Sequence, residues 1–196
     1  MQVDVFDLRT FSKVEGADYQ KTEATEIGWL RPIPLPEAKE FFGSRLLGAG
    51  WKELDQSVTQ LDTDKSWLRV YTKDGFFLRL FLNELSTSTG YKSSVELLNA
   101  GNIDTRQLPM PADAKKTYED VLFTAFETGG AVQGVIEQSQ ETFKELGWTE
   151  RECQETPSGA MVTFVQNAIR LQVNIQKAET GSSVYYSVFA LKADES

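Results

Sequence analysis

Two stretches of the chain, residues 36–49 and 131–146, carry apolar residues at the spacing of an α-helix. This spacing places the apolar side chains on one face, so each stretch is predicted to be a helix that buries that face. Pro36 suits the first helical turn, where its missing N–H is no loss. The apolar positions are Ala38, Phe42, Leu46 and Ala49, with Phe41 at the margin, and then Val132, Val135, Ile136, Phe143 and Leu146.

Both predicted helices are followed by a glycine and a tryptophan, Gly50–Trp51 and Gly147–Trp148. Glycine adopts the left-handed conformation after a helix at little cost, and an apolar residue just beyond it can fold back on the last turn. The pattern therefore predicts the same helix cap twice, with both tryptophans as core anchors. A tryptophan that stacks on a ligand is the alternative.

Short runs rich in β-branched, aromatic and alternating residues predict strands on both sides of each helix. Lys73-Asp74-Gly75 is a strong hairpin signal, and Gln166–Asn167 is a weaker turn at the matching place in the second half. Each half is expected to contain two strands, the helix and about three more strands. The expected strands are 3–8, 24–30, 67–72, 76–83 and 93–98, and then 103–108, 121–127, 160–165, 168–176 and 183–191.

The two halves of the chain are weak copies of each other. The Gly-Trp pairs recur about a hundred residues apart, which is the size of a domain rather than of a solenoid repeat, and Leu78 likewise matches Leu171. The predicted fold is therefore α+β, with two tandem repeats in residues 1–98 and 99–196. Each repeat is expected to be an antiparallel sheet with one helix packed across a face (ββαβββ-like), the second repeat packed on the first.

A short charged motif shares this repeat. Asp7-x-Arg9 recurs as Asp104-x-Arg106 at the same displacement as the Gly-Trp pairs. Residues two apart in a strand point to the same side, so these residues are interpreted as structural ion pairs on one face of a strand.

The charge of the chain argues against nucleic acid as a partner. The net charge is −9 and the isoelectric point about 4.7, a balance that repels phosphate backbones and anionic membrane surfaces. The densest basic cluster is Lys115–Lys116, and Glu119–Asp120 follows it closely. A basic stripe that could overcome the overall charge is therefore not expected.

No apolar stretch approaches the roughly 18 residues that a membrane helix needs, so membrane insertion is not expected. The start of the chain lacks the basic and apolar regions of a signal peptide, which favours a cytoplasmic location. An envelope protein trimmed of its leader would have the same start. The oligomeric state is left open.

The residue inventory argues against an enzyme, a metal site and a cofactor. The chain has no histidine, which excludes the Ser–His and Cys–His nucleophile systems and the common zinc ligand sets. Cys153 is the single cysteine, and the neighbouring Glu152 and Glu155 would raise its pKa if they lie close. Asp62-x-Asp64 could contribute to a calcium loop, but the remaining ligands of such a loop are out of register, so a solvated loop is expected.

The predicted strand 76–83 provides the candidate binding surface. Phe77, Arg79 and Phe81 share one of its faces, and the other face is also apolar. A sheet that is apolar on both faces needs a cover, and exposed apolar patches mark interaction sites. That cover is either the other repeat, or a partner protein or flat hydrophobic ligand.

The neighbouring strand 67–72 contributes a second row of side chains. Either Trp67, Arg69 and Tyr71 or Leu68 and Val70 share the face of Phe77, depending on whether the hairpin loop has two or three residues. That alternative stays open. The candidate binding residues are Phe77, Arg79, Phe81, Trp67 and Tyr71.

A helix that ends in Gly-Trp, followed by a hairpin, resembles small helix-grip-like repeats of uncharacterised bacterial proteins and some lipoproteins. The likeness rests on residues 46–51 with 67–82, and 143–148 with 161–175. It implies a binding or assembly module and carries over no catalytic residue. The expected function is non-enzymatic binding or assembly through the aromatic sheet face. The alternative is carriage of a small apolar ligand between helix and sheet.

Overall fold

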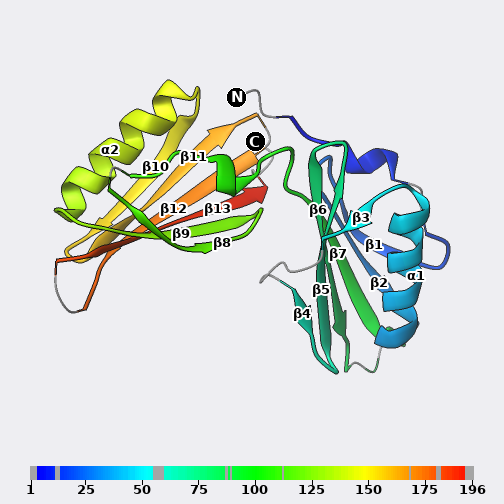
Figure 1. Ribbon diagram of the computed structural model, residues 1–196. Coiled ribbons are helices and arrows are strands. Elements are labelled where there is room, and N and C mark those ends of the chain that lie inside the picture. Colours follow the sequence, from blue (N-terminus) through cyan, green and yellow to red (C-terminus); the bar gives the residue numbers. More distant parts are fainter. Residues whose placement is uncertain are drawn as a thin grey trace. The chain divides into compact units, whose positions relative to one another are not determined.

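The computed structural model describes residues 4–11, 14–54, 60–86, 88, 90–111, 113–167, 169–179 and 182–192. The chain divides into two compact units, which we call the N-terminal unit (Val5–Asn102) and the C-terminal unit (Ile103–Ser196, with Met1–Asp4). Each unit has one antiparallel sheet and one helix that lies across a face of it (Figure 1). The predicted α+β class, with one helix on each sheet, is confirmed.

The N-terminal unit contains a 3₁₀ turn, a helix and a sheet ordered β1-β2-β7-β6-β5-β3, with β4 paired to β5. Its elements are η1 (Leu8–Thr10), β1 (Asp18–Thr22), β2 (Glu26–Arg31), α1 (Leu35–Gly48), β3 (Lys52–Glu53), β4 (Leu61–Asp62), β5 (Ser66–Lys73), β6 (Phe76–Glu84) and β7 (Ser93–Asn99).

The C-terminal unit repeats this arrangement, because its sheet runs β8-β9-β13-β12-β11-β10 with α2 between β9 and β10. Its elements are η2 (Thr105–Gln107), β8 (Lys115–Glu119), β9 (Phe123–Thr128), α2 (Val132–Glu145), β10 (Thr149–Thr156), β11 (Gly159–Gln166), β12 (Ile169–Lys177) and β13 (Val184–Lys192). Among the described residues, no helix has the length and apolar character needed to cross a membrane.

The prediction of a first strand in each half is wrong for the residues that the structure describes. Asp7 and Asp104 instead cap the 3₁₀ turns η1 and η2, where each carboxylate accepts the backbone N–H two residues ahead. The same carboxylates pair with Arg9 at 2.7 Å and Arg106 at 2.6 Å, so the two ion pairs are confirmed, but within turns. Local side-chain hydrogen bonds of this kind compete with strand pairing.

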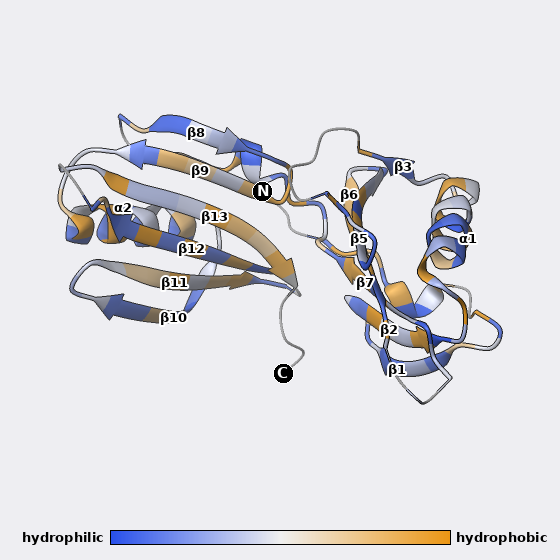
Figure 2. Cartoon of the chain, turned by 90° about the horizontal axis from the view of Figure 1, so that it is seen from below, coloured by the Kyte–Doolittle hydropathy of each residue, from blue (hydrophilic) through white to orange (hydrophobic). Residues whose placement is uncertain are grey.

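The strands β1, β3, β4, β8 and β10 were not predicted; β3 and β4 have two residues each, and β4 includes Asp62, for which a solvated loop was expected. The strands β1, β8 and β10 border their sheets, and β10 is exposed at seven of its eight positions. Figure 2 colours most of β10 as hydrophilic. A strand that buries neither face has no polar–apolar alternation, and charged side chains along it discourage pairing with other chains.

The helix caps form as the Gly-Trp pairs predicted. Gly50 (φ 85°) and Gly147 (φ 83°) are left-handed. The N–H of Trp51 donates to the Leu46 carbonyl at 3.0 Å, and the N–H of Trp148 to the Phe143 carbonyl at 3.0 Å. The glycine N–H groups donate one residue further along, to the Leu47 and Lys144 carbonyls, which completes a Schellman motif in both units.

Each core lies between the helix and the sheet. In the N-terminal unit Phe42 of α1 contacts Trp29 of β2, with ring centroids 5.2 Å apart. In the C-terminal unit Phe143 of α2 packs on Phe164 of β11 at 4.7 Å and edge-on to Trp148 at 6.5 Å. Both capping tryptophans are almost fully buried, so their role as core anchors is confirmed.

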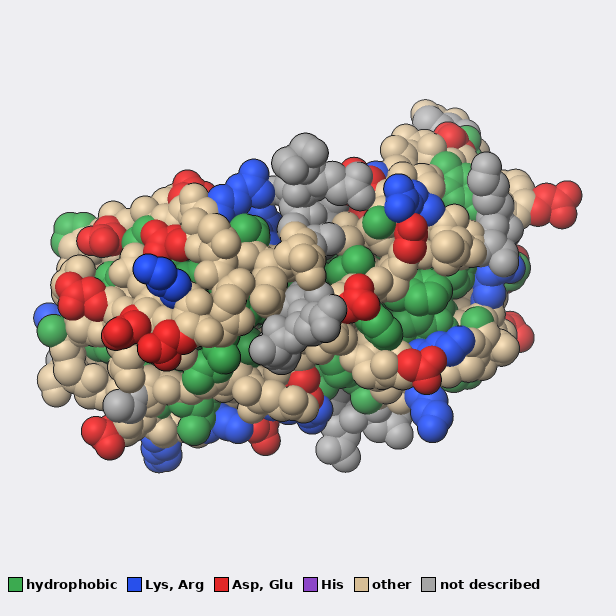
Figure 3. All heavy atoms as spheres, turned by 90° about the horizontal axis from the view of Figure 1, so that it is seen from above, with side chains coloured by type: hydrophobic (Ala, Val, Ile, Leu, Met, Phe, Trp, Pro, Cys, Tyr) green, Lys and Arg blue, Asp and Glu red, His purple; other side chains and the backbone are tan. Residues whose placement is uncertain are grey.

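The charged side chains on one surface of the chain are mixed in sign. Lys and Arg side chains lie apart from one another among Asp and Glu on the face that Figure 3 shows. That face therefore presents no continuous basic stripe.

The left-handed cap predicts opposite effects of alanine at two glycines of α2. Gly147→Ala should lower the free energy of unfolding by about 1 kcal/mol, because a Cβ disfavours this backbone conformation, and it would also stand 3.2 Å from Gln166 Nε2. Gly134→Ala should raise it by up to about 1 kcal/mol, since nothing lies within 4 Å of the added Cβ. Urea denaturation followed by circular dichroism measures both. Equal effects of the two substitutions would contradict the assigned cap.

The capping carboxylate of η1 predicts a pH dependence. The hydrogen bonds from Arg9 hold the pKa of Asp7 below its ordinary value. A lowered folded pKa contributes stability above the unfolded pKa of about 3.9, and this is lost as pH falls through the folded pKa. Asp7→Asn keeps a capping oxygen and removes the charge, so it should be less stable than the native chain at pH 7, with the difference vanishing in acid. If the difference in stability between Asp7→Asn and the native chain did not depend on pH, it would not come from the charge of Asp7.

Candidate functional site

The β5–β6 hairpin determines which residues share the face of Phe77. Its loop has two residues, Asp74 (φ 51°) and Gly75 (φ 82°), the signature of a type I′ turn. In this register Trp67 pairs with Leu82, and Tyr71 pairs with Leu78. The residues that pair with Phe81, Arg79 and Phe77, and so share the opposite face with them, are Leu68, Val70 and Thr72. The five candidate binding residues therefore do not form one surface.

Trp67 and Tyr71 lie under the helix of the N-terminal unit. A Cβ placed on Gly43 of α1 would stand 3.7 Å from the Tyr71 hydroxyl and 3.9 Å from the Trp67 ring. Tyr71 is fully buried, and burial, followed by the charge of Glu53, raises the pKa of its phenol. Both residues fill the core, so the prediction that placed them at a binding surface is corrected by the two-residue turn.

Phe77, Arg79 and Phe81 remain together on the sheet face away from α1. Phe77 is 7% exposed and Phe81 is half-buried. Burial lowers the pKa of the Arg79 guanidinium, while Glu96 and Glu26 raise it. This face carries charges beside its aromatic rings, and a binding role for it stays a prediction.

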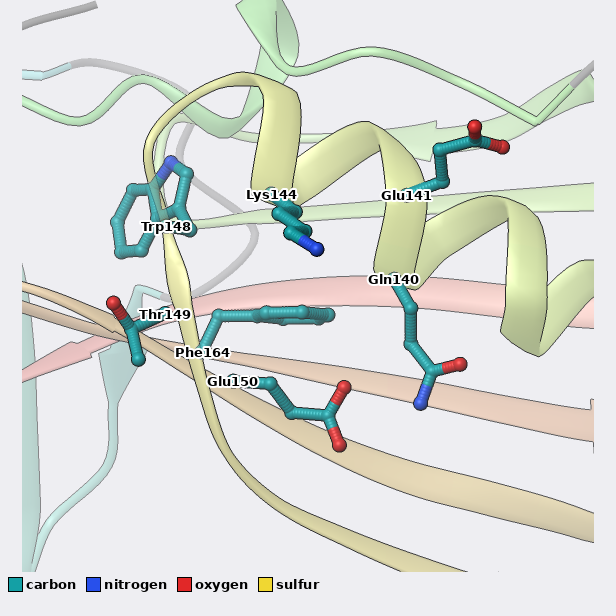
Figure 4. Close-up of a pocket in the computed structure, with 7 residues that line it drawn as sticks. All are labelled: Gln140, Glu141, Lys144, Trp148, Thr149, Glu150 and Phe164. Carbon is teal, nitrogen blue, oxygen red and sulfur yellow. The ribbon is translucent and has the colours of Figure 1, made fainter.

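A cleft of about 690 Å³ opens beside the helix of the C-terminal unit. We call it the α2 cleft; its residues come from α2, from the start of β10 and from β11 (Figure 4). Such a volume lies within the usual range for small-molecule sites, about 300–1,000 Å³. The lining residues are Gln140, Glu141, Lys144, Trp148, Thr149, Glu150 and Phe164.

Equivalent positions of the two hairpins differ in side-chain size. When the closing pairs of the two hairpins, Lys73–Phe76 and Gln166–Ile169, are aligned, Ala160 stands where the N-terminal unit has Trp67. Similarly, Phe164 stands at the place of Tyr71. Phe164 is among the residues that line the α2 cleft, whereas Ala160 is buried outside that lining.

Ion pairs also cover the part of α1 that lies beside Trp67. Arg69 stacks over Trp67 at 4.9 Å and pairs with Glu53 at 3.0 Å and with Asp62 at 2.9 Å. Lys39 of α1 pairs with the same Asp62 at 2.8 Å, so this aspartate is used in ion pairs across the helix and sheet. In the C-terminal unit Val162 stands at the place of Arg69, and this bridging network is not formed there.

The side chains of the α2 cleft combine an aromatic floor with polar walls. In Figure 4 the Lys144 ammonium, the Gln140 amide and the Glu150 carboxylate lie around the ring of Phe164, whereas Glu141 points away. Among the described residues, no ion pair joins Lys144 or Glu150 to another side chain. One cation and one carboxylate therefore face the cleft around a ring that is itself almost fully buried.

The Cys153 thiol of this unit is only weakly reactive. Burial, Glu150 and Glu155 raise the pKa of the Cys153 thiol, which keeps it protonated near neutral pH and weakly nucleophilic. Glu152, expected to contribute to this shift, instead accepts a hydrogen bond from Gln154. Within the described ranges, no three His, Cys, Asp or Glu residues are grouped so as to hold a metal ion.

The α2 cleft was not predicted from the sequence. Its lining residues come from α2, from the start of β10 and from β11. The strand β10 is exposed along almost its whole length, so the polarity pattern gave no sign of it or of the cleft beside it.

Removal of the indole at position 67 tests the assignment of Trp67 to the core. Trp67→Ala should lower the free energy of unfolding of the N-terminal unit by about 3–5 kcal/mol, because it leaves a cavity under α1. Leu61→Ala removes an exposed side chain of the same sheet and should change it by about 0.5 kcal/mol or less. Denaturant titration of both variants measures the difference. Equal small effects of the two substitutions would indicate that the Trp67 side chain is exposed and does not belong to the core.

No protein-family model, curated protein or solved structure matches this chain. The likeness to helix-grip-like repeats therefore stays a prediction.

Proposed function

We propose that the protein is a non-enzymatic binding module that holds a small ligand in the α2 cleft. The observation that supports this most directly is the contrast at one helix flank: Trp67 and Tyr71 fill it in the N-terminal unit, and about 690 Å³ is open in the C-terminal unit. Close packing is the rule in protein interiors, so a large opening beside an otherwise packed core marks a place for a ligand.

The lining residues support a ligand with both apolar and polar parts. Phe164 and Trp148 line the cleft with rings that are almost fully buried, and Gln140 and Thr149 offer neutral hydrogen-bonding groups. Lys144 on one side and Glu150 on the other provide opposite charges. A small ring compound with an anionic group toward Lys144 and a cationic group toward Glu150 would use all of these. A purely apolar ligand would leave both charges without a partner in the bound state.

Binding without chemistry is favoured by the same geometry. Catalysis by two carboxylates needs both of them to face the substrate, and Glu141 points away while Glu150 faces inward. The weakly nucleophilic Cys153 supplies no alternative. The cleft therefore offers groups that orient a ligand and no pair that would transform it.

The test uses three ring probes that carry a carboxylate, an aminomethyl group or both: benzoate, benzylamine and 4-(aminomethyl)benzoate. Titrated into the ¹⁵N-labelled protein, the last should shift the amide signals of Gln140, Lys144 and Thr149 at the lowest concentration. Each single-charge probe should bind several-fold more weakly at this cleft, because an exposed ion pair contributes up to about 1 kcal/mol. Lack of shifts with all three probes up to about 10 mM would contradict the proposal.

Three substitutions locate that binding. Lys144→Gln and Glu150→Gln each remove one charge that faces the cleft and should weaken the shifts several-fold. Glu145→Gln changes a charge on the same helix outside the cleft and should leave them unchanged. If Lys144→Gln does not fold, Glu150→Gln against Glu145→Gln still decides. Equal affinity of those two variants would place the ligand elsewhere.

A further inference from the structure

Two arginines of the N-terminal unit lie against aromatic rings. The guanidinium of Arg31 lies 4.8 Å from the centroid of Phe41. Arg45 lies 6.0 Å from the same ring and 5.5 Å from that of Phe11. Stacking of this kind fixes the plane of a guanidinium group.

The position of Arg31 is unusual for a charged residue. It continues the row of Ile27 and Trp29 on β2, whose side chains face α1 and are buried. Its carbonyl accepts the N–H of Lys92, and the Ser93 hydroxyl donates to the Ile33 carbonyl at 2.9 Å, which holds the strand end in place. A cation is therefore positioned by rigid backbone at the margin of the core.

The charge of Arg31 is uncompensated by the part of the chain that the structure describes. Arg9, Arg69 and Arg106 each pair with a carboxylate at 3.0 Å or less, but no such pair is formed by Arg31. Its Nε and Nη1 atoms are buried and donate to no described acceptor. In a chain of net charge −9, an unpaired and half-buried guanidinium marks a local site for an anion.

An open cleft of about 570 Å³ lies at this cluster, lined by Arg31, Phe41 and Arg45 with Glu15 and Gly16. Phe41 is 36% exposed there and is one of the few large apolar side chains that reach solvent. We call this space the α1 cleft. It presents two cations, a ring and, at its rim, one carboxylate.

The equivalent place in the C-terminal unit is closed and neutral. Counted from the two capping tryptophans, Thr128, Gln138 and Thr142 stand where the N-terminal unit has Arg31, Phe41 and Arg45. The space there measures only about 10 Å³ and is bounded by Pro109, Met110 and Pro111. Cations, ring and opening are thus present together in one unit and absent together from the other.

We propose that the α1 cleft is a second binding site, which takes a small ring compound bearing one oxyanion group, either a carboxylate or a phosphate monoester. The guanidinium group of Arg31 holds the oxyanion, since arginine matches the geometry of both groups, and Arg45 adds a second positive charge to the cleft. The ring of the ligand lies against the exposed part of Phe41. Glu15 at the rim disfavours a second oxyanion group and so favours ligands with one such group over polyanions.

Titration of the ¹⁵N-labelled protein with benzoate, phenyl phosphate, inorganic phosphate and neutral methyl benzoate tests the site. Benzoate and phenyl phosphate should shift the amide signals of Arg31, Phe41 and Arg45 and the side-chain Nε–H signal of Arg31. The probe that binds more tightly shows whether the site prefers a carboxylate or a phosphate monoester. Thr128, which stands at the place of Arg31 in the other unit and outside α2, serves as an internal control and should not move. An equal response to methyl benzoate, or none to either ring anion up to about 10 mM, would overturn the proposal.

Two substitutions separate this site from general attraction to the protein. Arg31→Lys keeps the positive charge but loses the paired N–H donors of the planar guanidinium group. It should therefore weaken the binding of benzoate and phenyl phosphate about ten-fold. Phe41→Leu should weaken them while sparing the response to inorganic phosphate. Arg106→Lys alters an arginine of the other unit and should have no effect. If Arg31→Lys does not fold, the exposed Phe41→Leu carries the test. Unchanged affinity in the folded variant would sink the inference, whatever the α2 cleft binds.

Discussion

The Schellman cap at the end of each helix is the constraint on which the rest of each unit depends. Glycine in the left-handed conformation turns the chain sharply, and the next residue, a tryptophan, is brought back under the last turn. The cap therefore fixes where the helix stops, anchors one large ring in the core and starts the strand that follows. A substitution that loosened it would move the helix relative to the sheet, and with it the walls of the α2 cleft.

With the helix fixed, the side chains beneath it differ between the two units. In the N-terminal unit Trp67 and Tyr71 lie beside Gly43 of α1 and complete the core. In the C-terminal unit Gln140, Ala160 and Phe164 occupy the corresponding places, and Gln140 and Phe164 line the α2 cleft. The backbone order is the same in both units, so function is expected to reside in these exchanges rather than in the fold.

Sequence reasoning succeeded where one local rule acts without competition. The helices were predicted within one residue at each end because their apolar spacing and their Gly-Trp caps agree. It failed at Asp7 and Asp104, where a carboxylate hydrogen-bonds its own backbone and a strand-like run becomes a turn. It also failed at β10, an exposed border strand whose backbone pairing with β11 leaves no trace in the polarity of its residues.

The candidate site was predictable only in part, because strand alternation identifies two faces without saying which is which. The residues that share a face within each strand were predicted correctly. Which face carries Trp67 depended on the length of one turn, and Asp74 and Gly75 set that length through their positive φ angles. The arginines of the α1 cleft were beyond the same reasoning. Arg31 and Arg45 lie in different elements, and only the packing of α1 on β2 brings both to the ring of Phe41.

The two clefts open on opposite flanks of equivalent helices. At about 100° per residue, positions 41 and 45 of α1 lie on one side of its buried stripe, and positions 43 and 47 lie on the other. The α1 cleft uses the first flank, and the α2 cleft uses Gln140 and Lys144, which are the equivalents of 43 and 47. Each unit seals the flank that the other opens: with Trp67 and Tyr71 in one, and with residues 109–111 in the other. A single cleft lost by drift would leave one unit filled on both flanks. The reciprocal pattern instead favours two units of one architecture that have been adapted to two different ligands.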